Sequence, residues 1–118
     1  MDFVFYQHDS KKTTIYKKNL KILYPCMGLA GEAGEVSNKI KKIYRDKGGK
    51  YTEEDRTEIA DELGDVLWYV SQLATDFNMS LDAIAQHNLH KLQIRKRRGT
   101  LKGKGDNRWT GSIQQTFI

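Results

Sequence analysis

Hydrophobic residues recur along most of the chain at the three-to-four-residue spacing of an amphipathic helix, and this pattern predicts an all-α fold. Three local signals mark where helices begin. Pro25 suits a first helical turn, Thr52 in "TEED" has an acid three residues later, and Ser80 precedes an apolar periodic run. Four helices are therefore expected, over residues 3–18, 25–46, 52–77 and 81–97.

The chain after Gly99 has no hydrophobic period and is expected to form a basic loop and tail. A length of 118 residues is enough for one hydrophobic core, so we expect a single domain over residues 1–118. Within it, residues 109–118 are expected to be disordered or to lie on a neighbouring subunit. The predicted architecture is a four-helix-type bundle followed by this tail.

The third predicted helix has an apolar surface wider than one neighbouring helix requires. At ~100° per residue, its apolar side chains spread over about half of the circumference. They are Ile59, Leu63, Val66, Leu67, Val70, Leu73 and Ala74. Such a helix is either central in a bundle or contacts another subunit on its second flank. For a chain of four helices we favour the subunit contact, which predicts an obligate homodimer or homotetramer.

The net charge of +5 is concentrated at the C-terminal end. From Asn88 onward the chain has eight basic residues and one acidic residue. A basic end of this kind suits nucleic acid or a small polyphosphate. The lone Cys26 excludes an internal disulfide, and we find neither a run of ~20 apolar residues nor the order of a secretory signal. These features predict a cytoplasmic protein that does not bind a membrane.

The segment "GLAGEAGEV", residues 28–36, combines glycines and glutamates at a spacing of three. A phosphate-binding glycine loop would need a strand before it and a Lys-Ser/Thr pair after it, and neither is present. A helix is therefore expected here. Its glycines Gly28, Gly31 and Gly34 each cost roughly 0.5–1 kcal/mol in a helix, which indicates that they make room for a partner helix or a ligand.

Four carboxylates form two pairs of equal spacing on the second and third predicted helices. Glu32 and Glu35 point within ~60° of each other, and Glu62 and Asp65 repeat that spacing at the edge of the apolar stripe. The 26 residues between the pairs allow one helix to end and the next to return antiparallel. All four acids are therefore expected at one level of a helix pair.

Carboxylates held this close need compensation, because two of them about 4 Å apart repel by ~4 kcal/mol at an effective dielectric of ~20. Raised pKa values, cationic side chains or divalent cations can supply it. An all-oxygen set without His or Cys suits Mg²⁺, with Mn²⁺ as a substitute. One such pair alone is typical of solvated surface charge, whereas two pairs bordering apolar stripes favour a metal site.

The two acidic segments together, "GLAGEAGEV" and "DELGDVLWYV", resemble the MazG-like group of all-α nucleoside triphosphate pyrophosphohydrolases. The signature of that group is E-x-x-E followed at about this distance by E-x-x-D. The resemblance continues through "NLHKLQIRKRRGT" and "GKGDNR" and covers roughly Tyr6 to Arg108. Some short proteins of this group are virus-encoded, which would place the protein in the cytoplasm of a host cell.

The resemblance implies hydrolysis of the α–β phosphoanhydride of a nucleoside or deoxynucleoside triphosphate. A metal-activated water would attack the nucleotide, and the products would be a nucleoside monophosphate and pyrophosphate. The residues implied to bind Mg²⁺ and to carry the catalysis are Glu32, Glu35, Glu62 and Asp65.

The resemblance also points to residues that contact the substrate. On the fourth predicted helix Asn88, Lys91 and Arg95 fall within a ~60° arc beside apolar positions, and they resemble the phosphate-contacting set of the group. Alternatively, the two cations only extend from the edge of the apolar stripe. Tyr69, one turn after Asp65, either bonds a phosphate oxygen or is a core aromatic residue.

A different class of function stays open beside the hydrolase. The basic end would allow a helical module that binds nucleic acid or regulates a partner. Nucleic acid is not expected, because no recognition helix or aromatic platform is evident. The preferred base, the sugar and the biological purpose also stay open, and base choice is expected to depend on side chains such as Gln7, Tyr24 or Trp68.

Overall fold

The structure is a computed structural model that describes residues 1–99. Its helices are α1 (Phe3–Lys11), the 3-10 turn η1 (Lys18–Leu20), α2 (Leu23–Lys47), α3 (Glu53–Asp76) and α4 (Leu81–Arg97). The described part of the chain contains no strand. The all-α class predicted from the sequence is therefore confirmed, while the predicted basic loop and tail after Gly99 lie outside the described residues.

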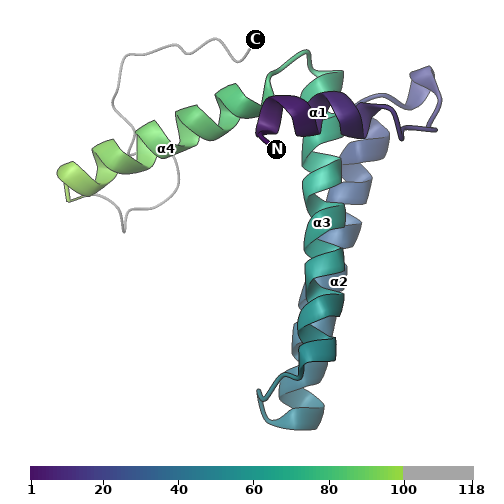
Figure 1. Cartoon of the computed structure of the whole chain (residues 1–118), viewed down its shortest axis with the longest axis vertical. Helices are drawn as coiled ribbons and strands as arrows, with labels where there is room; N and C mark the ends of the chain where they lie inside the picture. Colours follow the sequence, from purple (N-terminus) through teal and green to yellow (C-terminus); the bar gives the residue numbers. More distant parts are fainter. Residues whose placement is uncertain (100–118) are drawn as a thin grey trace.

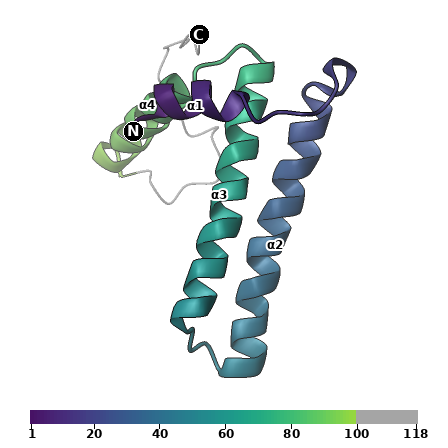
Figure 2. The same ribbon diagram turned by 45° about the vertical axis from the view of Figure 1, so that its right-hand side comes forward.

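The long helices α2 and α3 form an antiparallel pair that is the main body of the molecule (Figure 1). The short helix α1 lies across the end of this pair where α3 ends. From that end α4 leads away from the pair, and a second view shows the same divergence (Figure 2). The single chain is thus a helical hairpin with two helices at one end, and α4 does not run along α2 and α3.

The turn between α2 and α3 is built from local signals in the sequence. Helix α2 ends at Lys47 and is capped by Gly48, whose φ of 59° is the left-handed conformation that glycine adopts without strain. Thr52 then starts α3 with a capping box, in which its Oγ1 accepts from the Asp55 amide at 3.1 Å. Lys47 pairs with Asp55 at 2.8 Å. These contacts set the antiparallel register of the two helices.

The prediction of one helix over residues 3–18 is wrong, because α1 ends at Lys11. The hydroxyl groups of Thr13 and Thr14 donate to the carbonyl oxygens of Ser10 and Lys11, both at 2.7 Å. Side-chain bonds of this kind compete with helical hydrogen bonds and favour a turn. The chain therefore leaves the helix at this point, although its apolar spacing continues.

Polar side chains fasten α1 to the end of α3. Gln7 donates through Nε2 to Thr75 Oγ1 at 3.0 Å and to the Met79 carbonyl at 2.8 Å, and its Oε1 accepts from the Leu81 amide at 2.8 Å. Both ends of the Gln7 amide are therefore used within the fold. This places Gln7 in the junction of α1, α3 and α4, and the suggested influence of Gln7 on base choice stays a prediction.

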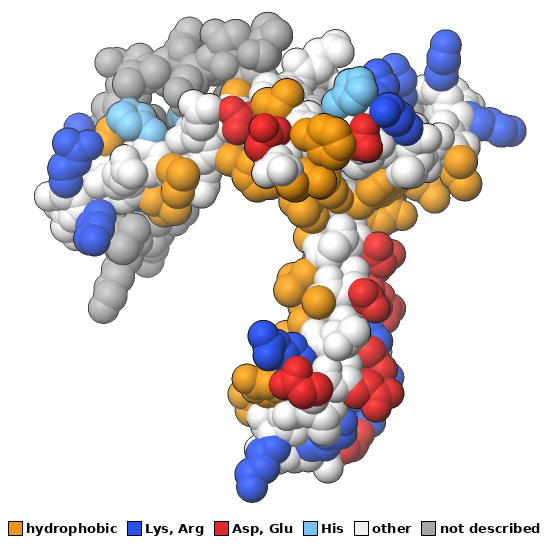
Figure 3. Space-filling model, in the orientation of Figure 1, with side chains coloured by type: hydrophobic (Ala, Val, Ile, Leu, Met, Phe, Trp, Pro, Cys, Tyr) orange, Lys and Arg blue, Asp and Glu red, His pale blue; other side chains and the backbone are white. Residues whose placement is uncertain are grey.

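Little of the hydrophobic surface of the described chain is buried. Among its apolar residues only Pro25, Ile43, Ala74 and Leu81 are buried, whereas Leu63 is 53% exposed and Phe5 is 50% exposed. Hydrophobic side chains gather where α1 crosses the α2–α3 pair (Figure 3). A monomer rarely leaves this much apolar surface to water, so the surface is available for a contact with another chain.

Candidate active site

The antiparallel packing of α2 and α3 brings three of the four predicted acids together. One carboxylate oxygen each of Glu32, Glu62 and Asp65 lies within 4.8 Å of the other two. We call these three residues the acid cluster. Glu32 comes from α2, and Glu62 and Asp65 come from α3. The helix pair therefore holds three oxygen donors around one point.

The acid cluster is electrostatically unfavourable without a cation. Partial burial raises the pKa of Glu32, and hydrogen bonding to Glu62 and the negative charges of Asp65, Glu62 and Glu35 raise it further. These are the effects expected when carboxylates share a low-dielectric space. A proton or a metal ion at this position would relieve the repulsion.

Glu35 is placed differently from the other three predicted acids. It is exposed and lies outside the acid cluster, although its charge acts on both Glu32 and Lys39. Three residues correspond to almost one turn of helix, or ~4.5 Å along its axis, so Glu35 is displaced along α2 from the level of Glu32. The acid cluster thus contains three of the four predicted acids, and a role of Glu35 beside them stays a prediction.

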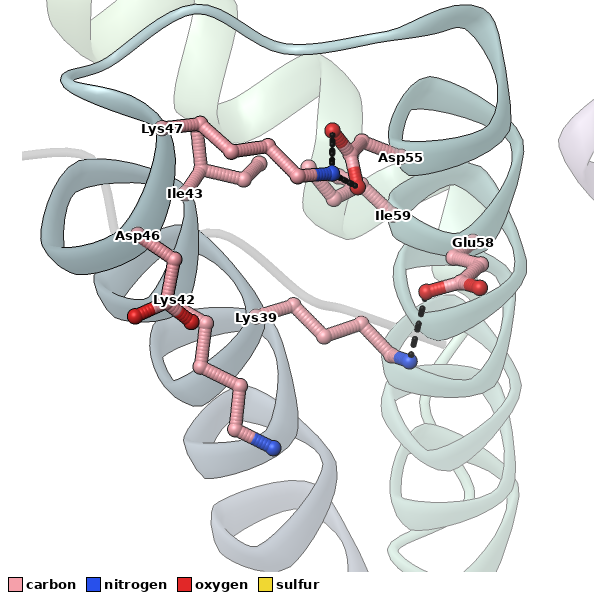
Figure 4. A pocket seen from close by; sticks show the side chains of 8 residues that line it. All are labelled: Lys39, Lys42, Ile43, Asp46, Lys47, Asp55, Glu58 and Ile59. Atoms are coloured by element: carbon pink, nitrogen blue, oxygen red, sulfur yellow. Dashed lines mark hydrogen bonds and ion pairs between the residues drawn. The ribbon is translucent and has the colours of Figure 1, made fainter.

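Lys39 and Glu58 border the acid cluster, and neither was identified from the sequence. The Lys39 ammonium group donates to Glu58 Oε2 at 3.3 Å and lies 3.8 Å from Glu62 Oε1. Both residues line a cavity of about 240 Å³ between α2 and α3, in which Lys39 reaches across from α2 (Figure 4). Lys39 follows Glu35 by four residues and so lies on the same helix face. This spacing could have identified it from the sequence as a neighbour of the acids.

Tyr69 lies against α2 beside the acid cluster. Its ring occupies the space next to Gly28, so that a methyl group at Gly28 would overlap the ring. Burial raises the pKa of Tyr69, with further contributions from Tyr24 and from the charges of Glu32 and Asp65. Gly28 therefore makes room for an aromatic side chain of the neighbouring helix α3, whereas a Cβ at Gly31 or Gly34 would meet no described atom within 4 Å.

We predict that Gly28→Ala lowers the free energy of unfolding by roughly 1–3 kcal/mol, because the added methyl group must displace Tyr69. Gly31→Ala is the matched control. A Cβ at Gly31 meets no described atom within 4 Å, and alanine is the better helix former by ~1 kcal/mol. Chemical denaturation of both variants measures the difference, and equal stabilities would contradict the close contact between Gly28 and Tyr69.

Two aromatic rings lie beside that of Tyr69. Its ring is 5.0 Å from that of Trp68 in an edge-on arrangement and 6.3 Å from that of Tyr24. Tyr24 stacks on Tyr16 at 4.8 Å, and the Trp68 indole N–H donates to Thr13 Oγ1 at 2.8 Å. Two of the side chains suggested for base choice, Tyr24 and Trp68, thus lie next to Tyr69, and Tyr24 is 41% exposed.

The structure does not bring the predicted phosphate-contacting set to the acid cluster within one chain. Asn88 is exposed, Lys91 is half-buried and Arg95 is buried, and all three belong to α4. Because α4 leads away from the α2–α3 pair (Figures 1 and 2), this set and the acid cluster lie on different arms of the molecule. Helical spacing could predict that the three residues share one face of α4. It could not predict that α4 leads away from the α2–α3 pair.

Comparison with known proteins assigns the family. The model of the MazG nucleotide pyrophosphohydrolase domain matches residues 24–100, which include all four predicted acids and the phosphate-contacting set. The chain belongs to the MazG nucleotide pyrophosphohydrolase family. The resemblance seen in its motifs is thereby confirmed, and MazG proteins are typically metal-dependent.

Two relatives are similar to the chain. Gene 37 protein of Mycobacterium phage L5 is 56% identical over 85 residues, which are 72% of this chain and 75% of that protein. Uncharacterized protein YpjD of Bacillus subtilis (strain 168) is 35% identical over 78 residues, which are 65% of this chain and 69% of that protein. No solved structure matches the chain.

Within residues 1–99, no helix is both long enough and apolar enough to cross a membrane.

Proposed function

We propose that the chain is a single MazG domain that hydrolyses the α–β phosphoanhydride of nucleoside or deoxynucleoside triphosphates with the help of Mg²⁺. The products are a nucleoside monophosphate and pyrophosphate. The observation that carries the proposal is the acid cluster, in which three carboxylate oxygens lie within 4.8 Å of one another inside the family domain.

The donors of the acid cluster fit a hard divalent cation. All are carboxylate oxygens, which Mg²⁺ and Mn²⁺ prefer, and the pKa of Glu32 is raised by burial, by its hydrogen bond to Glu62 and by neighbouring negative charge, which a cation would offset. We assign Glu32, Glu62 and Asp65 as ligands, with Glu35 joining them from the next turn of α2. When bound, the ion would neutralise phosphate charge and lower the pKa of an attacking water.

Side chains beside the acid cluster would position the nucleotide. The Tyr69 ring packs against Gly28 close to Glu32 and Asp65, so we assign its hydroxyl group as a donor to a phosphate oxygen. The neighbouring Tyr24 is partly exposed and offers an aromatic surface for the base. These contacts would orient the substrate with its α-phosphorus toward the acids.

A second copy of the chain would complete the site. A triphosphate needs cations beyond the metal, and the assigned set of Asn88, Lys91 and Arg95 stands on α4, away from the acid cluster of its own chain. The exposed apolar side chains of α1 and α3 supply surface for a homodimer or homotetramer. We therefore propose that α4 of one chain faces the acid cluster of its partner.

The reaction is tested by chromatography of the products formed from the eight common nucleoside and deoxynucleoside triphosphates. With Mg²⁺ we expect monophosphate and pyrophosphate in equal amounts, and with excess EDTA we expect neither. The reason is that attack at the α–β bond releases the two terminal phosphates together. Diphosphate with orthophosphate would contradict the proposed bond, and full activity in EDTA would contradict the metal requirement.

A further inference from the structure

Lys39 is the cationic side chain that contacts the acid cluster in the described structure. It extends from α2 across the helix pair toward Glu58 (Figure 4). Its ammonium nitrogen lies 3.3 Å from Glu58 Oε2 and 3.8 Å from Glu62 Oε1. Its side chain is 29% exposed, whereas that of Glu62 is 19% exposed. Water therefore reaches the two charged groups only in part and screens their interaction incompletely.

The ammonium group of Lys39 carries a full positive charge at neutral pH. Its hydrogen bond to Glu58 raises its pKa above the ordinary value, and the charges of Glu58, Glu62 and Glu35 act in the same direction. Desolvation acts the other way and does not overcome them. A permanent cation thus stands at the edge of the position where the metal would bind.

Two opposite effects of Lys39 on metal binding are conceivable. It could fix Glu62 in a productive orientation and strengthen binding, or its charge could repel the incoming cation and weaken binding. The distances decide between them. The hydrogen bond of Lys39 goes to Glu58, while 3.8 Å is too long for a hydrogen bond to Glu62. Lys39 therefore does not hold Glu62 by a hydrogen bond, whereas its positive charge acts on a cation at the acid cluster over distances longer than a hydrogen bond.

We propose that Lys39, held by Glu58, is a built-in counter-ion that lowers the affinity of the free enzyme for divalent cations. This inference rests on the metal site of the proposed function. Its consequence is an enzyme that takes up metal poorly on its own and better together with a triphosphate. The negative charge of the triphosphate attracts Lys39 and the metal alike.

The test is Mn²⁺ binding to the nucleotide-free full chain, followed by electron paramagnetic resonance. We expect Lys39→Gln to bind Mn²⁺ about 2- to 5-fold more tightly than the wild type, the range of partly exposed charge interactions. Lys39→Arg keeps the charge and should match the wild type. Glu58→Gln should bind more weakly, because it removes a negative charge and releases Lys39 toward Glu62. Circular dichroism of each variant checks that it folds.

Lys42→Gln is the matched control. It removes the same charge from α2 three residues further on, where Lys42 lines the cavity without the ion pair to Glu58 that Lys39 makes (Figure 4). A Lys39→Gln affinity equal to or weaker than that of the wild type overturns the inference, as does an equal gain in Lys42→Gln. Failure of the proposed metal site itself gives a different result. In that case the wild type and Glu62→Gln bind Mn²⁺ equally, or neither binds it.

Discussion

Replacing Glu62 by Gln is expected to lower kcat by about 100-fold or more in the presence of saturating Mg²⁺, since ~2.7 kcal/mol of lost transition-state stabilisation corresponds to that factor. Glu62 is a member of the acid cluster and also interacts with Lys39, so its charge is central to the site. Glu32→Gln and Asp65→Asn are expected to behave alike. Initial-rate kinetics with pyrophosphate detection measure the effect.

Asp61→Asn is the control for these substitutions. Asp61 directly precedes Glu62 on α3, but it is exposed and lies outside the acid cluster. The loss of its charge should change kcat by less than about threefold, in keeping with an exposed interaction. A Glu62→Gln enzyme with near-normal turnover, or an equal loss in Asp61→Asn, would contradict the role assigned to the acid cluster.

Co-expression of Glu62→Gln with Lys91→Glu is expected to restore about a quarter of the wild-type activity, although each variant alone is nearly inactive. If α4 of one chain serves the acid cluster of its partner, a mixed dimer has one site with both defects and one site with none. Half of the dimers are mixed, and each of them has one intact site. The assay uses substrate well below KM, because loss of a phosphate contact acts mainly on KM.

The control for this complementation is co-expression of Glu62→Gln with Glu32→Gln. Both residues belong to the acid cluster of one chain, so every site in the mixed dimer lacks one of its acids. No recovery is expected. If Glu62→Gln with Lys91→Glu recovers no more activity than this pair, the phosphate-contacting set does not act across the subunit interface.

Local features of the fold could be predicted from the sequence because their causes are local. Thr52 and Ser80 start α3 and α4 through hydrogen bonds to amides three residues away, and such caps depend only on adjacent residues. The end of α1 was missed, because the turn at Thr13 and Thr14 competes with an apolar period that continues beyond it. Hydrophobic spacing alone could not identify that competition.

Features that depend on tertiary contacts were less predictable. Pairing of α2 with α3 follows from the acid spacing and the short turn, and it brings Glu32 to Glu62 and Asp65. The direction of α4 depends on packing at the end of α3, which periodicity does not contain. The approach of Lys39 to Glu62 depends on helix register and on a rotamer, so the sequence alone offered only its spacing from Glu35.

The central claim, that the acid cluster holds the catalytic metal, is tested most directly by an anomalous difference map from crystals containing Mn²⁺ and an α,β-imido deoxynucleotide. The account predicts a Mn²⁺ peak within ~2.5 Å of carboxylate oxygens of Glu32, Glu62 and Asp65, with the nucleotide phosphates beside it. A nucleotide bound with no Mn²⁺ peak at these three residues, or with its peak at other residues, would contradict the account.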